Sequence, residues 1–105
     1  MNEETQRIQV TLGELEAKVE KATKWRDLLS NPLFKELITD DYLGNDTIRL
    51  SMNIKPKAED NEIVNNMLMA KSIFSRFVAN VIDEGVQAQT SIIENQELQD
   101  EIDSE

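Results

Sequence analysis

The sequence predicts an all-α fold: an antiparallel pair of long helices with coiled-coil-like packing and one or two short helices between them. Two stretches, 11–29 and about 60–95, repeat apolar residues in steps of three and four, the spacing of one helix face. The segment between them carries helix-breaking and helix-capping residues and offers no pair of neighbouring strand patterns. With 105 residues, the chain has room for one domain with a modest core, expected over 11–93.

The first helix is expected over 11–29, after a loose N-terminal arm over 1–10. Thr11 and Glu14 have capping-box spacing, in which each side chain satisfies an unpaired backbone N–H group at the start of a helix. Trp25 or Arg26 stands at the one interrupted step of the apolar pattern. The other residues of that pattern are Leu12, Leu15, Val19, Ala22 and Leu29.

A break is expected at residues 30–32, because Asn31 is a good helix cap and Pro32 suits the first helical position, where no backbone N–H is needed. A short helix follows, and Gly44 is expected to end it. Residues 46–54 permit two interpretations. Their apolar residues alternate as in a strand, yet no nearby segment offers a partner strand, so we expect a short helix there.

The long helix carries two adjacent apolar rows. The two rows together make one broad apolar stripe, which we expect the first half of the chain to cover. After Val81 the apolar pattern resumes one place late, at Gly85, which indicates a bend or a change of packing partner. The first row is Ile63, Met67, Ala70, Phe74, Phe77 and Val81, and the second row is Val64, Leu68, Val78 and Ile82.

Acidic residues concentrate at the C-terminal end of the chain. There are 21 acidic and 11 basic residues, a net charge of −10, and residues 83–105 hold eight acids and no base. Because a run of this kind is usually solvated, we expect 94–105 to be an acidic tail that extends the helix by a turn or two and then frays. The acids of this tail are Glu94, Glu97, Asp100, Glu101, Asp103 and Glu105.

Composition argues against catalysis. Without histidine or cysteine, the chain lacks the usual general base, thiolate nucleophiles and the commonest transition-metal ligands. Its three scattered glycines form no phosphate-binding loop, and no calcium-loop pattern occurs. We therefore expect a non-enzymatic protein with no catalytic residues, no cofactor and no metal.

Charge and length point to protein partners. The net negative charge argues against direct binding of nucleic acid or anionic membranes, and the absence of a signal peptide or membrane span predicts a soluble cytoplasmic protein. Helix 11–29 is little more than half as long as helix 60–95, so the uncovered part is expected to contact another copy or another protein. The candidate partner-binding residues are Trp25, Met69, Gly85, Ala88, Ile92 and Ile93.

The stretch 28–38, LLSNPLFKELI, together with Tyr42-Leu43 and 48–50, resembles a recurring pattern in small acidic helical proteins of tailed bacteriophages. The resemblance covers about residues 10–95 and implies a phage protein, in the host cytoplasm or associated with the virion. With the length mismatch, it leads to the hypothesis of an oligomeric scaffold or accessory component of particle assembly. The alternative is an acidic inhibitor or adaptor, a DNA mimic or host-factor binder, that acts on a host protein.

Overall fold

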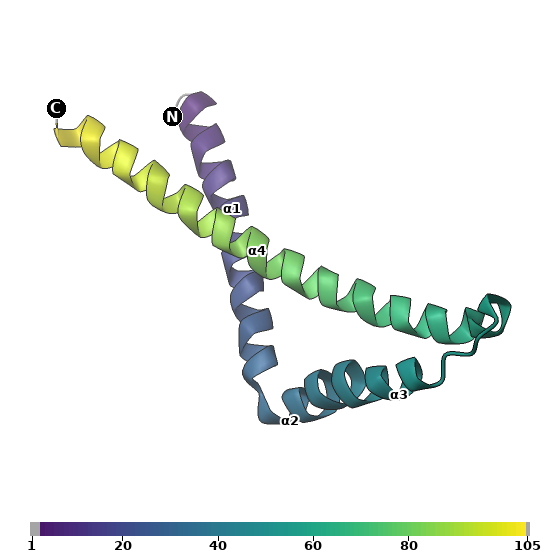
Figure 1. The fold of residues 1–105 in the computed structure, drawn as a ribbon. Helices are drawn as coiled ribbons and strands as arrows, with labels where there is room; N and C mark the ends of the chain where they lie inside the picture. The colour runs from purple at the N-terminus through teal and green to yellow at the C-terminus, as the bar shows by residue number, and fades with distance from the viewer. Residues whose placement is uncertain (1–2, 105) are drawn as a thin grey trace. The chain divides into compact units, whose positions relative to one another are not determined.

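The computed structural model describes the backbone of residues 3–104 and the side chains of residues 11–103. Its regular elements are all helices, so the predicted all-α class is confirmed for the described residues. The open question at 46–54 is settled in favour of a helix over Asp46–Met52, while residues 53 and 54 lie outside it. The elements, in chain order, are α1 (Glu3–Ser30), α2 (Pro32–Phe34), the π-helix η1 (Lys35–Asn45), α3 (Asp46–Met52), the 3₁₀-helix η2 (Ala58–Asn61) and α4 (Glu62–Ser104) (Figure 1).

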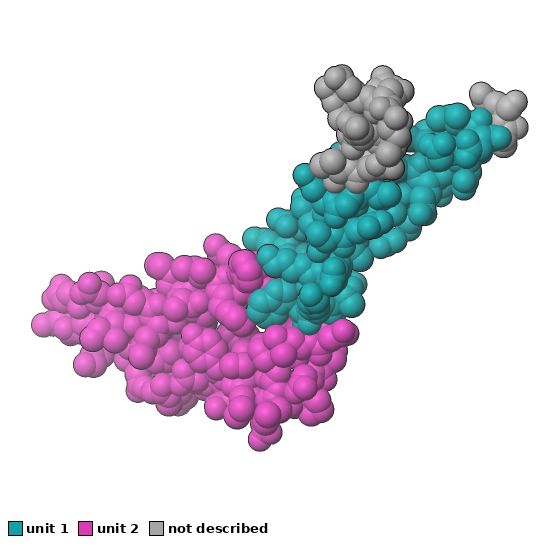
Figure 2. Space-filling model, turned by 180° about the vertical axis from the view of Figure 1, so that it is seen from behind, with its two compact units in different colours: residues 1–26, 80–105 teal, residues 27–79 magenta. Residues whose placement is uncertain are grey.

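The chain divides into two compact units, a division that the sequence analysis does not predict. The first unit combines residues 1–26 with residues 80–105, and the second holds residues 27–79 (Figure 2). Helix α4 contributes to both, with residues 62–79 in the second unit and 80–104 in the first. The packing partner of the long helix therefore changes along its length, which is one of the two outcomes expected from the shift after Val81.

In the first unit, α1 and the C-terminal part of α4 cross and then separate toward Glu3 and Ser104 (Figure 1). Gly85 lies at the crossing, where a Cβ atom would overlap the methyl group of Ala22 and come within 3.2 Å of the Lys18 carbonyl oxygen. Ala22 is itself buried. The two backbones thus meet with almost no side-chain volume between them, because both residues at the contact are small.

Helix α1 is longer than expected at its start. It begins at Glu3, so the expected helix start at Thr11 and the loose arm over 1–10 are wrong for the residues that the structure describes. Residues 3–12 contain no proline or glycine, and most of them are good helix formers such as glutamate, glutamine and arginine. A capping-box spacing inside such a run does not mark a boundary. The other end of α1, at Ser30, agrees with the prediction to within one residue.

The break after α1 forms as the sequence predicts. The Asn31 side-chain oxygen accepts hydrogen bonds from the backbone N–H groups of Leu33, at 3.0 Å, and of Phe34, at 3.2 Å. Pro32 occupies the first helical position, where its missing N–H costs nothing. The cap therefore fixes the point at which α2 begins.

The helix that follows is wider than an α-helix over eleven residues, Lys35–Asn45. In a π-helix each backbone N–H bonds to the carbonyl five residues earlier, and the Asp46 N–H does so to Asp41. The half-buried positions of this stretch are Phe34 and Ile38, followed by Leu43, Gly44, Asp46 and Thr47 near its end.

Gly44 does not end this helix, so that prediction is wrong. A glycine that ends a helix adopts the left-handed conformation, whereas no described glycine here has a positive φ. Gly44 instead relieves crowding inside the wide helix, since a Cβ atom on it would lie 3.3 Å from the carbonyl oxygen of Thr39.

A buried asparagine fixes the connection that leads into α4. Asn61 is 5% exposed, and its side-chain oxygen accepts a hydrogen bond of 2.7 Å from the Lys55 N–H. Its side-chain nitrogen donates to the carbonyl oxygens of Lys55, at 2.8 Å, and of Lys57, at 3.2 Å. One side chain therefore supplies the polar partners that the non-helical backbone needs.

Replacing Gly85 by alanine is expected to destabilise the protein, because the added Cβ atom forces α1 and α4 apart. Overpacking of this kind costs about 1–3 kcal/mol. Gly13→Ala is the matched control, since Gly13 lies in α1 with nothing within 4 Å of an added Cβ atom. That change should stabilise the fold by about 1 kcal/mol. Urea unfolding followed by circular dichroism measures both values, and a Gly85→Ala variant as stable as Gly13→Ala contradicts the close crossing.

Candidate functional site

An exposed apolar row runs along the part of α4 that belongs to the second unit. We call it the outer row, and its members follow each other in steps of four, three, three and four: Ile63, Met67, Ala70, Ile73 and Phe77. The exposed fractions are 74% for Ile63, 61% for Ile73 and 48% for both Met67 and Phe77. Single exposed apolar residues are common on protein surfaces, but a contiguous row marks a contact surface.

The outer row corrects the expected orientation of α4. Most of the first row of the expected covered stripe faces outward, and only Phe74 and Val81 of that row turn inward. The second row faces the interior of this unit instead, with Val64 and Leu68 half-buried and Val78 buried. Steps of three and four fit both rows equally well, so periodicity alone cannot select between them.

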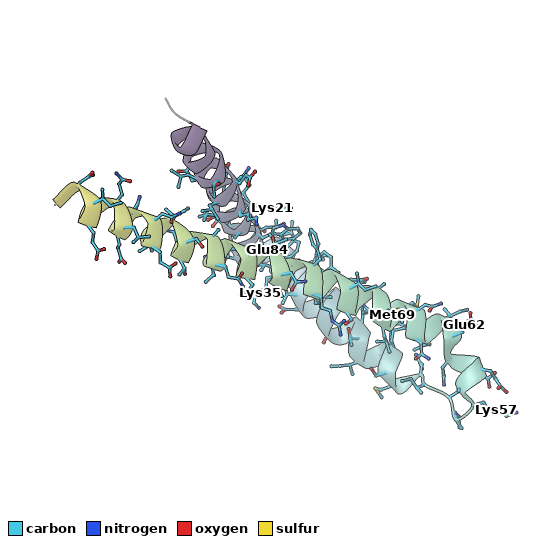
Figure 3. All side chains as sticks on the ribbon, turned by 90° about the horizontal axis from the view of Figure 1, so that it is seen from above. Lys21, Lys35, Lys57, Glu62, Met69 and Glu84 are labelled. Carbon is cyan, nitrogen blue, oxygen red and sulfur yellow. The ribbon has the colours of Figure 1, made fainter. Side chains whose placement is uncertain are left out.

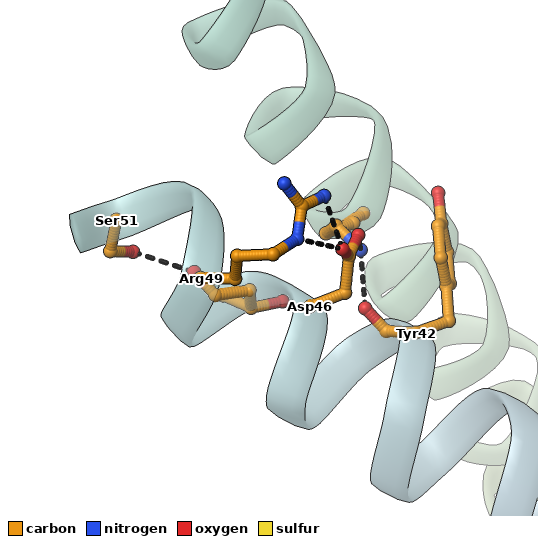
Figure 4. A network of polar contacts seen from close by, with 6 residues as sticks. Tyr42, Asp46, Arg49 and Ser51 are labelled. Carbon is orange, nitrogen blue, oxygen red and sulfur yellow. Dashed lines mark hydrogen bonds and ion pairs between the residues drawn. The ribbon is translucent and has the colours of Figure 1, made fainter. Parts of the chain in front are cut away.

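Lys71 occupies the inward face of α4, between Leu68 and Val78, and is 5% exposed. Its ammonium group donates a hydrogen bond to the backbone carbonyl oxygen of Tyr42 in η1 and lies 2.8 Å from a carboxylate oxygen of Asp46 (Figure 4). It also lies 3.5 Å from the centroid of the Tyr42 ring. A buried charge is tolerated only with such partners, so these three contacts hold α4 against η1 and α3.

The Tyr42 carbonyl is available because the helix type changes at this point. The Asp41 carbonyl accepts the last π-type bond, from the Asp46 N–H, and in α3 each N–H then bonds to the carbonyl four residues earlier instead of five. Such a change leaves one carbonyl without a helical N–H partner, and that carbonyl, the next one after Asp41, belongs to Tyr42. Lys71 donates to it, so the wide helix and the buried lysine fit each other.

Asp46 is held ionised from two sides. The hydrogen bond from Lys71, and after it the one from Arg49, whose Nε lies 3.0 Å from the carboxylate, hold the pKa of Asp46 below its ordinary value of 3.8. Among the described side chains, no buried polar atom lacks a hydrogen-bond partner. The polar cluster is therefore a complete structural network.

The predicted partner-binding residues differ in their exposure to solvent, and three of the six are buried. Met69, labelled in Figure 3, is 59% exposed and lies beside the outer row, and Ile93 is about half exposed. Trp25 is half-buried and fills the interrupted step of α1, while Arg26 is exposed. The buried group consists of Gly85, Ala88 and Ile92.

That buried group corrects the expected position of the uncovered surface. Gly85, Ala88 and Ile92 are covered within the first unit, because the small residues at the crossing let α1 approach them closely. In the second unit, α4 exposes a row of apolar side chains between Ile63 and Phe77, and toward its C-terminal end it also exposes Ile93, Leu98 and Ile102.

The acidic segment is helical, so its description as a tail that frays is wrong as far as Ser104. Its described acids are all exposed on α4, and Glu105 lies outside the described residues. Glutamate is a good helix former, which offsets the unfavourable position of negative charge near a helix C-terminus. These acids are Glu94, Glu97, Asp100, Glu101 and Asp103.

Two shallow hollows flank the crossing in the first unit, with volumes of about 200 and 190 Å³. Both are smaller than ordinary small-molecule sites, which measure about 300–1,000 Å³. Among the described side chains, those of residues 11–103, no group of three or more acidic residues is arranged to hold a metal ion. In the same residues no helix has an apolar stretch sufficient to cross a bilayer.

Comparison with known proteins finds no family model, no curated protein and no solved structure that matches this chain.

The sequence analysis missed Lys71, although the sequence contains a signal for it. Lys71 follows Leu68 by three residues and precedes Val78 by seven, so it falls on the second apolar row as its one charged member. A lysine at such a position either interrupts the row or is buried with a partner. Ile73 was also missed, because it lies one residue before Phe74 of the first row.

Asp46→Asn is expected to lower stability at neutral pH, because it leaves the buried Lys71 ammonium without its carboxylate. Since the folded pKa of Asp46 lies below 3.8, its contribution is complete above that pH and is lost as pH falls through the folded value. The urea midpoints of the wild type and the variant should therefore differ at pH 7 and converge in strong acid. Asp40→Asn is the control, since the exposed pair of Asp40 with Lys35 should contribute less than about 1 kcal/mol. Equal effects of the two substitutions contradict this account of Lys71.

Proposed function

We propose that this chain is a non-enzymatic protein–protein interaction module that acts through the outer row. The observation that carries the proposal is the exposure of Ile63, Met67 and Ile73 on a helix face that the chain's second unit leaves uncovered. Aliphatic and methionine side chains of this kind are typical of the centre of an interface, where charged residues are rare. Around these side chains, the nearest charged residues on the same side of α4 are Glu62 and Arg76, at the two ends.

The exposed apolar surface of the chain supports association. Four large apolar side chains of the outer row, Ile63, Met67, Ile73 and Phe77, are each about half or more exposed. Burial of apolar surface contributes about 25 cal/mol per Å², so covering the outer row is favourable.

The proposed setting is the assembly of a phage particle, in which the module serves as a scaffold or accessory component. This part of the proposal is supported by the resemblance of residues 10–95 to small helical phage proteins. The outer row fits that role because a scaffold needs a recurring contact between proteins and no catalytic groups.

Ile73→Glu is expected to weaken association, because a carboxylate placed in an apolar contact is desolvated without a partner. We expect an increase of about tenfold or more in the dissociation constant, measured by sedimentation over a range of micromolar concentrations, and a matching loss of co-sedimentation with assembling particles. Asn65→Glu is the control, since Asn65 is exposed on the same helix but lies off the outer row. A wild-type chain that stays monomeric at tens of micromolar and binds no particle protein contradicts the proposal.

A second candidate function, an acidic inhibitor of a host DNA-binding protein, is favoured by one observation. Glu94, Glu97 and Glu101 share a face of α4 by their spacing of three and four, so they stand on a folded surface. Mimicry of DNA needs carboxylates in fixed rows, which a disordered tail does not provide.

Replacing Glu94, Glu97 and Glu101 together by glutamine tests this second candidate. If the acidic face binds a basic groove, the triple variant should lose inhibition of a host DNA-binding enzyme, and wild-type inhibition should weaken as salt increases. The control replaces an equal number of exposed acids on α1, Glu14, Glu16 and Glu20. Equal inhibition by the two triple variants, or no inhibition by the wild type, excludes this function.

A further inference from the structure

The outer row is symmetric about its central residue. Ile63 and Phe77 lie seven residues before and after Ala70, and Met67 and Ile73 lie three residues before and after it. The smallest side chain is therefore at the centre, with larger apolar side chains at equal distances on both sides. From this arrangement we infer that the outer row binds the same row of a second copy of the chain, with the two α4 helices antiparallel and related by a two-fold axis at Ala70. The inference rests on the proposed interaction function and names its partner.

A two-fold interface requires that each residue meets the residue at the mirrored distance from the axis. In the antiparallel pair, Ile63 of one copy meets Phe77 of the other, and Met67 meets Ile73. Ala70 meets its own counterpart, where its small side chain permits the close approach of two helices, whose axes ordinarily lie 8–10 Å apart. The row from Ile63 to Phe77 spans about 21 Å of helix, which amounts to four turns of contact.

Charge decides between antiparallel and parallel pairing. Glu62 and Arg76 stand fourteen residues apart at opposite ends of the outer row, and helical spacing puts both on the same flank of it. Residues on the same flank face each other across an antiparallel pair, so each Glu62 comes close to Arg76 of the other copy. In a parallel pair in register the same flank of the two copies falls on opposite sides of the interface, so Glu62 of one copy meets no Arg76 of the other. The helix dipoles also oppose each other favourably only in the antiparallel pair.

The composition of the exposed face also favours a second copy. The outer row exposes four large apolar side chains, Ile63, Met67, Ile73 and Phe77. The face is also poor in charge, since the exposed residues from Ile63 to Ile73 include no acidic or basic side chain. A strongly charged partner would find no complementary groups here, whereas a second copy presents the same apolar face.

The chain contains no cysteine, so a single introduced cysteine reports on one position. A disulfide forms only when two Cα atoms approach within about 4.4–6.8 Å. In the full-length protein, Ala70→Cys should form a disulfide-linked dimer under mild oxidation at least about tenfold faster than Asn65→Cys, which is exposed on another side of the helix. Non-reducing electrophoresis measures both rates, and circular dichroism checks that each variant is folded.

A mixed experiment tests the direction of the helices. Ile63→Cys and Phe77→Cys chains are oxidised alone and as a mixture. In the antiparallel pair only the mixture should cross-link rapidly, because identical ends lie about 21 Å apart. Rapid cross-linking of each variant alone indicates parallel helices and overturns the inference.

Different experimental results contradict the two-fold pairing and the proposed interaction function. If Ala70→Cys cross-links no faster than Asn65→Cys while sedimentation still shows association that Ile73→Glu weakens, the two-fold pairing is wrong and the interaction module stands. If the wild-type chain neither associates with itself nor binds another protein, both are wrong.

Discussion

One buried charge determines which face of α4 is turned toward the interior. Lys71 lies on its inward face, where the Tyr42 carbonyl, the Tyr42 ring and the Asp46 carboxylate receive its ammonium group. Turning the helix to bury Ile63 and Met67 would pull that ammonium away from all three partners. Because an unpaired buried charge is more costly than a few exposed apolar side chains, the network selects the second apolar row for the interior. The exposed outer row, and with it the proposed function, follows from that selection.

Sequence reasoning succeeded where the determining interactions are local. The Asn31 cap is made with the two residues that follow Pro32, so its signal is contained in four letters of the sequence. Only one narrow face of α1 is covered, and Trp25 lies on that face, at the interrupted step of the apolar pattern. The helical nature of 46–52 followed from the absence of a partner strand, which is also visible in the sequence.

Sequence reasoning failed where two local patterns were equally good. Two adjacent rows on α4 both have helical spacing, and the choice between them depends on η1 and α3, more than twenty residues earlier. The π-helix was missed because its period of four to five residues resembles an irregular α-helical pattern. Gly44 was misread for a related reason, since a glycine after an apolar pair has the appearance of a helix end whether or not its φ is positive. The candidate site therefore needed the structure, whereas the fold class did not.

The burial of Lys71 also makes its amine a chemical reporter. Reagents that acylate lysines react quickly with exposed amines such as those of Lys24 and Lys35, whose side chains are 74% and 61% exposed, and they require the unprotonated, accessible form of the group. The Lys71 amine, enclosed by the Tyr42 ring and the Asp46 carboxylate, would be modified only in molecules whose 35–52 segment has detached from α4. Its rate of acylation thus reads out how often this part of the chain opens.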